Sequence, residues 1–374
     1  MGSAAAYDLA TTDSACEVVL ADIDPVASER SASAIGHNVR PICLDVNNTD
    51  DCFAVFSGTS VVVSAVSYRV NYVVARTAMR AGAHMVDMGG NNEIVRQELS
   101  LNAEAESRGI TVVPNAGLAP GLINVLAITG YRELDTVEAI HLRVGGLPRH
   151  PRPPLNYQIV FSVEGLINEY VEKAIVLRNG QVTEIDSMGD LEEISFPAPL
   201  GTLEAFTTSG GISFLPDLLQ GKVNTLDYKT IRYPGHCEKF KTLLDLGFAT
   251  NEPLMVGTTI RTNREFFADL LRKKLDFGDT DLVVARATCA GLRRGVPTTV
   301  TYELIDYYDE RAKLSAMMRT TAFPVSVIAR MLADGVIRER GALLPEQCVP
   351  GQEMINELAK RGITITKRIT ETSR

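Results

Sequence analysis

The sequence contains no long apolar run and no excess of positive charge. Its apolar segments are the length of strands, well short of the roughly 18 residues that cross a membrane. The 46 acidic residues outnumber the 37 basic ones, giving a net charge of −9. We therefore expect neither a membrane-spanning protein nor one that grips nucleic acid through a basic surface.

Clustered cysteines are also missing. The chain has six cysteines, no two of them in a Cys-x-x-Cys pair, and no grouping of cysteine with histidine that suggests a metal site. The first residues lack a basic segment followed by an apolar one, so no secretory signal is indicated. These features predict a cytoplasmic protein whose thiols are reduced and buried. The cysteines are Cys16, Cys43, Cys52, Cys237, Cys289 and Cys348.

The first 115 residues alternate between short apolar runs and helical patterns. This alternation is typical of βαβ units and predicts an α/β, Rossmann-type parallel sheet. The predicted strands are 17–21, 40–44, 60–66, 84–88 and 110–113. The predicted helices are 3–9, 25–35, 49–56, 71–81 and 93–107.

The middle of the chain has a different pattern. Strand-like runs follow one another between Gly and Pro turns, and Asn179-Gly180 indicates a tight hairpin. The runs are AIHLRVGG, QIVFS, KAIVLR, QVTEI, DLVVARATCA and TTVTYELI. We predict a second, α+β domain with an antiparallel or mixed sheet. The predicted domains are 1–124 for the dinucleotide, 125–318 for substrate and dimerisation, and 319–374 returning to the first domain through a helix at 323–334.

The N-terminal segment resembles the end of a dinucleotide-binding motif. Gly2 stands where the third glycine of Gly-x-Gly-x-x-Gly would be, and Asp22 closes the next strand 20 residues later. The preceding strand and two glycines are absent, so we expect the natural protein to start upstream of Met1. The alternative is that Gly2 and Asp22 are ordinary residues. Because the phosphate loop is missing, we expect the 374-residue chain to bind NAD weakly. Micromolar NAD affinity in calorimetry would contradict this.

Several residues at the carboxyl ends of the predicted strands are candidates for cofactor binding, because ligands bind at that edge of parallel sheets. Asp22 is expected to bind the adenosine ribose and to favour NAD over NADP, with Asp24 as a rival. Asp45 could lie by the adenine or belong to the start of the next helix. The remaining candidates are Ser64, Ala65, Ser67, Asp87, Gly89, Gly90 and Asn115, the last beginning the segment NAGLAPGLIN.

Longer segments carry a family resemblance that covers nearly the whole chain. MGSAAAYDLA, VVVSAVSYRVNYVVARTAMRAGAHMVDMGG and GITVVPNAGLAPGLINVLA resemble the saccharopine dehydrogenase-like family. LDYKTIRYPGHCEKFK and RTTAFPVSVIARMLADGVIRERGALLPEQCVP resemble its lysine 6-dehydrogenase branch. The departures are the missing first strand and Asn115, where relatives often carry Asp.

The resemblance implies an NAD-dependent oxidoreductase that acts on a CH–NH₂ group. L-Lysine would lose hydride from its ε-carbon, and the hydrolysed imine would release ammonia and 2-aminoadipate 6-semialdehyde, which cyclises to piperideine-6-carboxylate. Such chemistry needs a base for the amine and a cation for the substrate carboxylate. The alternatives are a saccharopine or carboxynorspermidine dehydrogenase, whose substrates carry extra carboxylates, and a non-catalytic cofactor-binding member. NADP is the less expected cofactor.

The segment DYKTIRYPGHCEKF supplies the candidates for catalysis. Arg232 is expected to bind the substrate carboxylate and His236 to act as acid or base, with Tyr228 beside them. The alternative is that His236 has a structural role. Arg143 is a rival carboxylate binder, Tyr157 a pocket or core residue, and Thr208 a hydroxyl donor. We expect a small amino-acid substrate, no metal, and a homodimer or larger homo-oligomer formed through the β-rich domain.

Overall fold

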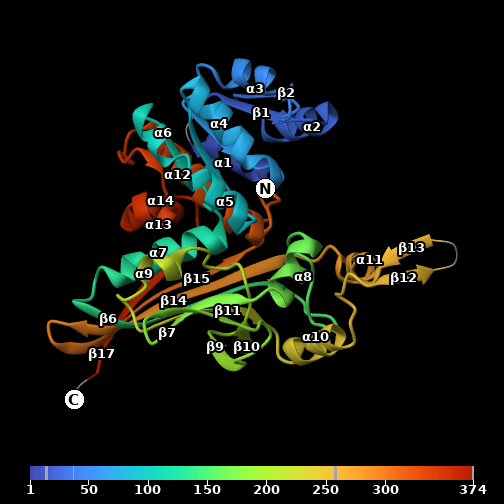
Figure 1. Ribbon diagram of the computed structural model, residues 1–374, viewed down its shortest axis with the longest axis vertical. Helices are drawn as coiled ribbons and strands as arrows, with labels where there is room; N and C mark the ends of the chain where they lie inside the picture. The colour runs from blue at the N-terminus through green and yellow to red at the C-terminus, as the bar shows by residue number, and fades with distance from the viewer. Residues whose placement is uncertain (13–15, 37, 257–258, 373–374) are drawn as a thin grey trace. The chain divides into compact units, whose positions relative to one another are not determined.

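The computed structural model describes residues 1–12, 16–36, 38–256 and 259–372. The chain forms two compact units (Figure 1). Unit 1 comprises Met1–Thr129 and Met318–Ile363, and unit 2 comprises Gly130–Met317 and Thr364–Arg374. The predicted helix at 323–334 thus belongs to unit 1. The end of the chain, in contrast to its predicted return to the first domain, adds a strand to unit 2.

The elements of unit 1, whose boundaries in the chain fall within α7 and α12, are α1 (Gly2–Thr12), β1 (Val18–Asp22), α2 (Pro25–Ile35), β2 (Val39–Cys43), α3 (Thr49–Phe56), β3 (Val61–Ser64), the short turn η1 (Tyr68–Val70), α4 (Asn71–Ala81), β4 (His84–Asp87), α5 (Asn92–Leu99), α6 (Asn102–Ser107), β5 (Thr111–Val113), the irregular turn η2 (Leu118–Leu122), α7 (Ile123–Tyr131), α12 (Ala316–Ala333), β16 (Gly341–Ala342), α13 (Pro345–Cys348) and α14 (Gly351–Lys360).

The elements of unit 2 are β6 (Thr136–Pro148), α8 (Val163–Val171), β7 (Ala174–Arg178), β8 (Gln181–Ile185), β9 (Glu192–Phe196), β10 (Gly201–Thr207), α9 (Leu215–Leu219), β11 (Thr225–Arg232), α10 (His236–Asp245), β12 (Pro253–Val256), β13 (Thr259–Thr262), α11 (Asn263–Leu275), β14 (Asp281–Arg293), β15 (Val296–Tyr307) and β17 (Ile365–Glu371).

Every strand pair of unit 1 is parallel, which confirms the predicted α/β class. The strands form two groups, β1-β2 and β16-β5-β4-β3. Among the described residues, β1 and β3 each pair along one edge only. In a doubly wound sheet the strand that leads into the first helix lies between these two.

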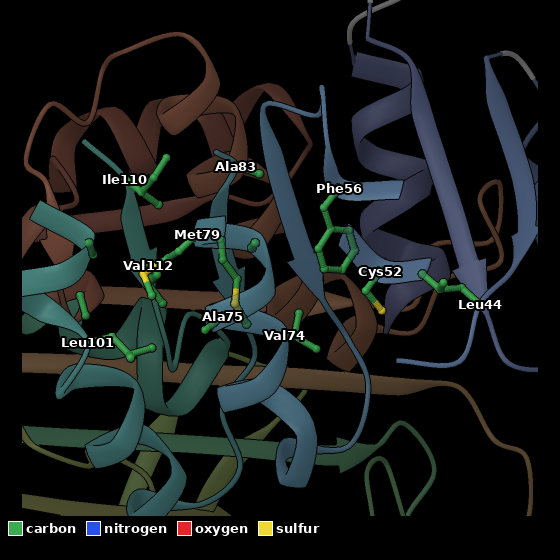
Figure 2. Close-up of a cluster of buried hydrophobic side chains, with 14 residues drawn as sticks. Leu44, Cys52, Phe56, Val74, Ala75, Met79, Ala83, Leu101, Ile110 and Val112 are labelled. Carbon is green, nitrogen blue, oxygen red and sulfur yellow. The ribbon is translucent and has the colours of Figure 1, made fainter. Parts of the chain in front are cut away.

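Helix α4 shows how the core of unit 1 forms. Its apolar side chains recur at helical spacing, and Val74, Ala75 and Met79 are buried against strand residues such as Val112 (Figure 2). The helix ends at Gly82, whose φ of 78° places it in the left-handed region that glycine adopts without strain. The helix predicted at 71–81 and its glycine cap are therefore confirmed.

Two predicted elements differ in the structure. The single helix predicted at 93–107 is broken into α5 and α6, and the break buries Leu101 in the core of unit 1. The segment QIVFS at 158–162 is not a strand. Instead, the Gln158 amide bonds both backbone groups of Asp279, and Ser162 caps the start of α8. The β-branched residues of this segment suggested the backbone hydrogen bonds of a β-strand. Hydrogen bonds between side chains and the backbone take their place.

Unit 2 is built on a nine-stranded mixed sheet with the order β17-β15-β14-β6-β11-β10-β9, and the hairpin β7-β8 joins at β11. Strands β6 and β11 are parallel, whereas the other pairs are antiparallel. The predicted hairpin turn is present, since Asn179 and Gly180 both have positive φ values, 51° and 73°.

Helices α8, α10 and α11 contribute to one apolar core together with Phe206 of β10. Phe206 pairs with Thr230, and side chains alternate along a strand, so Tyr228 and Arg232 face the same core. Lys229 and Ile231 project from the opposite face. The two faces of β11 therefore carry two separate polar clusters.

None of the helices in the described ranges is long and apolar enough to cross a membrane. The six cysteines are free. Four are buried as predicted, whereas Cys43 is exposed and Cys16 is half-buried.

Candidate functional site

Exposed carboxylates gather where β1 and β2 end. The strands are in register with Asp22 opposite Cys43, so the residues that follow them lie at one edge. Asp22 is exposed and accepts a hydrogen bond from the Asp24 amide at 3.0 Å. Asp24 itself caps α2, which gives Asp24 a structural role and leaves Asp22 as the acid at the strand end. Asp45 bonds Asn47 in the loop before α3 and does not cap that helix.

Small residues follow β3. Ala65 and Ser67 are exposed, while Ser64 is buried and donates a hydrogen bond to Asn71 at 2.8 Å. Gly2, at the start of α1, lies against this segment, because a Cβ at Gly2 would be 3.2 Å from Cβ of Ala65. The exposed residues at the ends of β1, β2 and β3 have the chemistry of the ribose side of a dinucleotide site.

The turn after β4 differs from its predicted role. Asp87 is fully buried and accepts hydrogen bonds from the amides of Gly89 and Asn115, at 2.5 and 3.2 Å. Asn115 is only 2% exposed, and its φ of 61° suits asparagine. Gly89 has no room for a Cβ, which would lie 2.0 Å from Oδ1 of Asn115. The side chains of Asp87 and Asn115 therefore hold the turn together and are not presented to a cofactor.

A second buried carboxyl group faces Asp87. Glu98 of α5 is fully buried, and among the described residues its two oxygens and Oδ2 of Asp87 have no hydrogen-bond partner other than each other. Burial, followed by the charge of Asp87, raises the pKa of Glu98 to about 10. Glu98 is therefore protonated at neutral pH, and the pair shares a proton.

In unit 2, a chain of hydrogen bonds joins β11 to α8 and α10. Nε of Arg232 donates to the Tyr170 hydroxyl at 2.9 Å, and that hydroxyl lies 3.0 Å from Nε2 of His236. Nδ1 of His236 lies 2.9 Å from the carbonyl oxygen of Leu155 and must donate to it. Tyr170 consequently donates to His236, which is neutral.

These surroundings correct the role predicted for His236. Glu204 accepts from the amides of Gly235 and Cys237 and so fixes the start of α10, where His236 is only 1% exposed. Burial and the nearby guanidinium of Arg232 lower the pKa of His236 to about 3. With both ring nitrogens bonded, His236 has no free lone pair at neutral pH, and it orients Tyr170.

Three other predicted residues lie on the same face of the sheet. The Tyr157 ring is fully buried 4.6 Å from the guanidinium carbon of Arg232. Thr208 and Thr230 share a hydrogen bond of 2.7 Å. Tyr228 packs against Gly211, where a Cβ would come within 2.2 Å of the ring. The structure therefore brings Tyr157, Thr208 and Tyr228 together with Arg232 and His236.

Arg143, in contrast, lies on the opposite face. It is in register with Lys229 of β11, and both cations bond Glu192. Arg143 also donates to Asp227 at 2.6 Å, and Asp227 bonds His141. This cluster neutralises its own cations, so Arg143, the predicted rival carboxylate binder, lies apart from the cluster around Arg232 and is already paired.

Sequence reasoning missed Glu169 of α8. Its Oε2 lies 4.0 Å from Nη2 of Arg232, and its side chain is 29% exposed whereas that of Arg232 is 3% exposed. Burial, opposed by Arg232, raises the pKa of Glu169 to about 7. The apolar stripe of α8 could have located it, since Glu169 precedes Tyr170, the last buried position of that stripe.

Two family models together match most of the chain. The Saccharopine dehydrogenase NADP binding domain matches residues 1–113, and the Saccharopine dehydrogenase C-terminal domain matches residues 117–363. Among curated proteins, a saccharopine dehydrogenase [NADP(+), L-glutamate-forming] of Pyricularia oryzae is 22% identical, over 96% of this chain and 95% of its own length. The mitochondrial alpha-aminoadipic semialdehyde synthase of Mus musculus is 24% identical over 83% of this chain, which spans about 40% of the mouse protein.

Solved structures share the fold. The apo saccharopine dehydrogenase (L-Glu forming) of Saccharomyces cerevisiae has a TM-score of 0.82 at 20% identity, covering 99% of this chain and 97% of that one. A homospermidine synthase of Legionella pneumophila in complex with NAD has a TM-score of 0.63 at 13% identity, with coverages of 95% and 85%.

Proposed function

Since the chain belongs to the saccharopine dehydrogenase family, a family of nicotinamide-dependent oxidoreductases, we propose that it oxidises the ε-amine of L-lysine with NAD. The products are ammonia and 2-aminoadipate 6-semialdehyde, which cyclises to piperideine-6-carboxylate. When bound, the nicotinamide ring supplies the hydride acceptor. Unit 1 supplies the groups for the adenosine end of the cofactor, and unit 2 supplies groups for the amino acid.

The observation that carries this choice of substrate is that Arg143 and Lys229, two buried cations of unit 2, are already neutralised. Both bond Glu192, whereas Arg232 approaches Glu169 only to 4.0 Å. A substrate with several carboxylates needs cations that are free to pair with it. An amino acid with one carboxylate and a second amine needs fewer free cations. Its ammonium group is attracted by a carboxylate such as Glu169.

NAD is favoured over NADP by the acids at the ends of β1 and β2. Asp22 is exposed there, with Asp24 and Asp45 in the loops that follow the same two strands. A carboxylate accepts hydrogen bonds from the ribose hydroxyls, whereas it repels the 2′-phosphate of NADP. The family name NADP binding domain makes this a point to test.

Replacing Asp22 with serine should lower kcat/KM for NAD about 10- to 100-fold, since hydrogen bonds to a charged group contribute about 1.5–3 kcal/mol. The value for NADP should stay the same or rise, because the repelling charge is gone. Steady-state kinetics with both cofactors measure the ratio. Glu29→Gln, which removes an exposed charge from α2, is the control and should leave the ratio unchanged. Equal losses for NAD and NADP in the Asp22 variant would remove Asp22 from cofactor selection.

Oxidation of saccharopine is the second candidate, because relatives of this chain bear that name. A panel of lysine, ornithine and saccharopine, each with NAD and NADP, separates the two by formation of the reduced cofactor. The proposal predicts the highest kcat/KM for lysine with NAD. Turnover of saccharopine at a higher kcat/KM than lysine would replace the proposal with the second candidate.

A further inference from the structure

We propose that Glu169 is the acid–base residue of unit 2, which takes a proton from the ammonium group of the amine substrate. This inference rests on the proposed function and adds a catalytic residue to it. Four observations support it: the position of Glu169 on α8, its contact with Arg232, its lack of hydrogen bonds, and the neutral groups around it.

The position of Glu169 follows from the pattern of α8. Val163, Leu166, Ile167 and Tyr170 recur at helical spacing and are buried in the core of unit 2. Glu169 therefore lies at the margin of the buried stripe, where its side chain keeps 29% of its surface exposed. A group at such a margin can meet a small molecule and still be influenced by the protein interior.

The guanidinium of Arg232 is close enough to Glu169 to affect its pKa, but it forms no hydrogen bond with the carboxylate. Two nitrogens of Arg232 are used elsewhere: Nε donates to Tyr170, and Nη1 donates to the carbonyl of Ile231. The third, Nη2, is 4.0 Å from Oε2 of Glu169, beyond hydrogen-bond distance. In the described part of the chain no group donates a hydrogen bond to the Glu169 carboxylate. Its lone pairs are therefore available to a substrate N–H.

The other titratable groups around Glu169 are neutral at physiological pH. Tyr228 of β11, Tyr157 of the loop before α8 and Tyr170 of α8 all have a raised pKa, because burial disfavours the phenolate. His236 of α10 is neutral as described above. Arg232 is thus the cation that opposes the effect of burial, and the balance leaves the pKa of Glu169 at about 7. A base with this pKa is suited to proton transfer near neutral pH.

The chemistry requires such a group. The ε-ammonium of lysine has a pKa of about 10.4, and its carbon cannot release hydride while the nitrogen is protonated. One N–H bond of the ammonium breaks and an O–H bond forms on Glu169. Once a bound nicotinamide had accepted hydride from the ε-carbon, water would add to the iminium ion, and both protons of that water would leave with the nitrogen as ammonium. The proton held by Glu169 passes to solvent, which regenerates the carboxylate and accounts for the one proton released in the overall reaction.

The test compares Glu169→Gln with Glu164→Gln, which changes an exposed glutamate of the same helix. We expect Glu169→Gln to lower kcat about 10²- to 10⁴-fold with a smaller change in KM. Wild-type kcat/KM should fall as the pH drops below about 7, and this acidic limb should be missing from the variant. Glu169→Asp should recover part of kcat, and Glu164→Gln should match the wild type.

A second readout does not depend on turnover. Carbon NMR of the cofactor-free protein, labelled at glutamate carboxyls, should show one carboxyl that titrates near pH 7 and is absent from Glu169→Gln. A variant within about threefold of wild-type kcat that keeps the acidic limb would overturn the role of Glu169. So would a Glu169 carboxyl that titrates near its ordinary value. If the wild-type protein oxidises no amine, the proposed function is wrong. If the wild type is active and Glu169→Gln keeps that activity, only the role of Glu169 is wrong.

Discussion

Replacing Glu98 with glutamine should stabilise unit 1 at neutral pH by about 1–3 kcal/mol. Glu98 is fully buried beside Asp87, and its pKa is raised from the ordinary value of a glutamate to about 10. The folded state must keep the proton that the unfolded chain loses above its ordinary carboxyl pKa. Glutamine carries no such proton and can still donate to Asp87.

The direction of the pH dependence follows from the raised pKa. The stability that protonated Glu98 contributes is fully present below its unfolded pKa and is lost as the pH rises toward 10. Urea denaturation of wild type and Glu98→Gln between about pH 4 and pH 9 should therefore show curves that diverge as the pH increases. Glu93→Gln, at an exposed position of α5, should change stability by less than about 0.5 kcal/mol. A Glu98→Gln variant that is less stable than wild type at neutral pH would show that the pair does not share a proton.

Replacing Asp8 with alanine should destabilise unit 1 by about 3–5 kcal/mol, because it removes one of the two carboxylates that bond the buried guanidinium of Arg361 and leaves Nε of Arg361 without its acceptor. Both Asp8 oxygens lie 2.8 Å from Nε of Arg361, and the two side chains are 3% and 4% exposed. Ser326 of α12 donates to the same carboxylate. The cluster therefore ties α1 to the C-terminal helices within unit 1.

The neighbouring exposed pair provides the control for Asp8. Lys360 contacts Glu357 on the surface of α14 with 65% of its side chain exposed, and Lys360→Ala should cost less than about 1 kcal/mol. Hydrogen exchange of the α1 amides, combined with urea denaturation, reports the transition of unit 1. The double variant Asp8→Leu/Arg361→Met should recover much of the loss, because it removes both charges. A loss for Asp8→Ala no greater than that for Lys360→Ala would contradict the account.

The fold was largely predictable because its signals are local. Helix α4 has apolar residues at helical spacing and a glycine cap, and Asn179-Gly180 is compatible with few turns other than the one observed. The errors arose where side chains bond the backbone, as at Gln158, or where burial of one residue breaks a helix, as at Leu101. Such contacts join residues far apart in the chain, so they do not appear in the spacing of apolar residues along the sequence.

The site was less predictable, because its properties depend on which face of a strand carries which residue. Arg232 was predicted to bind the substrate carboxylate with Arg143 as its rival, yet the two lie on opposite faces of the sheet. The histidine expected to titrate near neutral pH is buried and doubly bonded, and a glutamate on α8 takes the intermediate pKa. Glu169 resembles a solvated helix residue until Arg232 is placed beside it.

The most direct measurement of the proposed reaction uses lysine deuterated at its ε-carbon. The account predicts that purified protein transfers deuterium from this carbon to NAD, so that mass spectrometry detects deuterated NADH together with ammonia. Deuterium found only in unreacted lysine, with deuterated cofactor formed instead from a labelled secondary amine, would contradict the central claim.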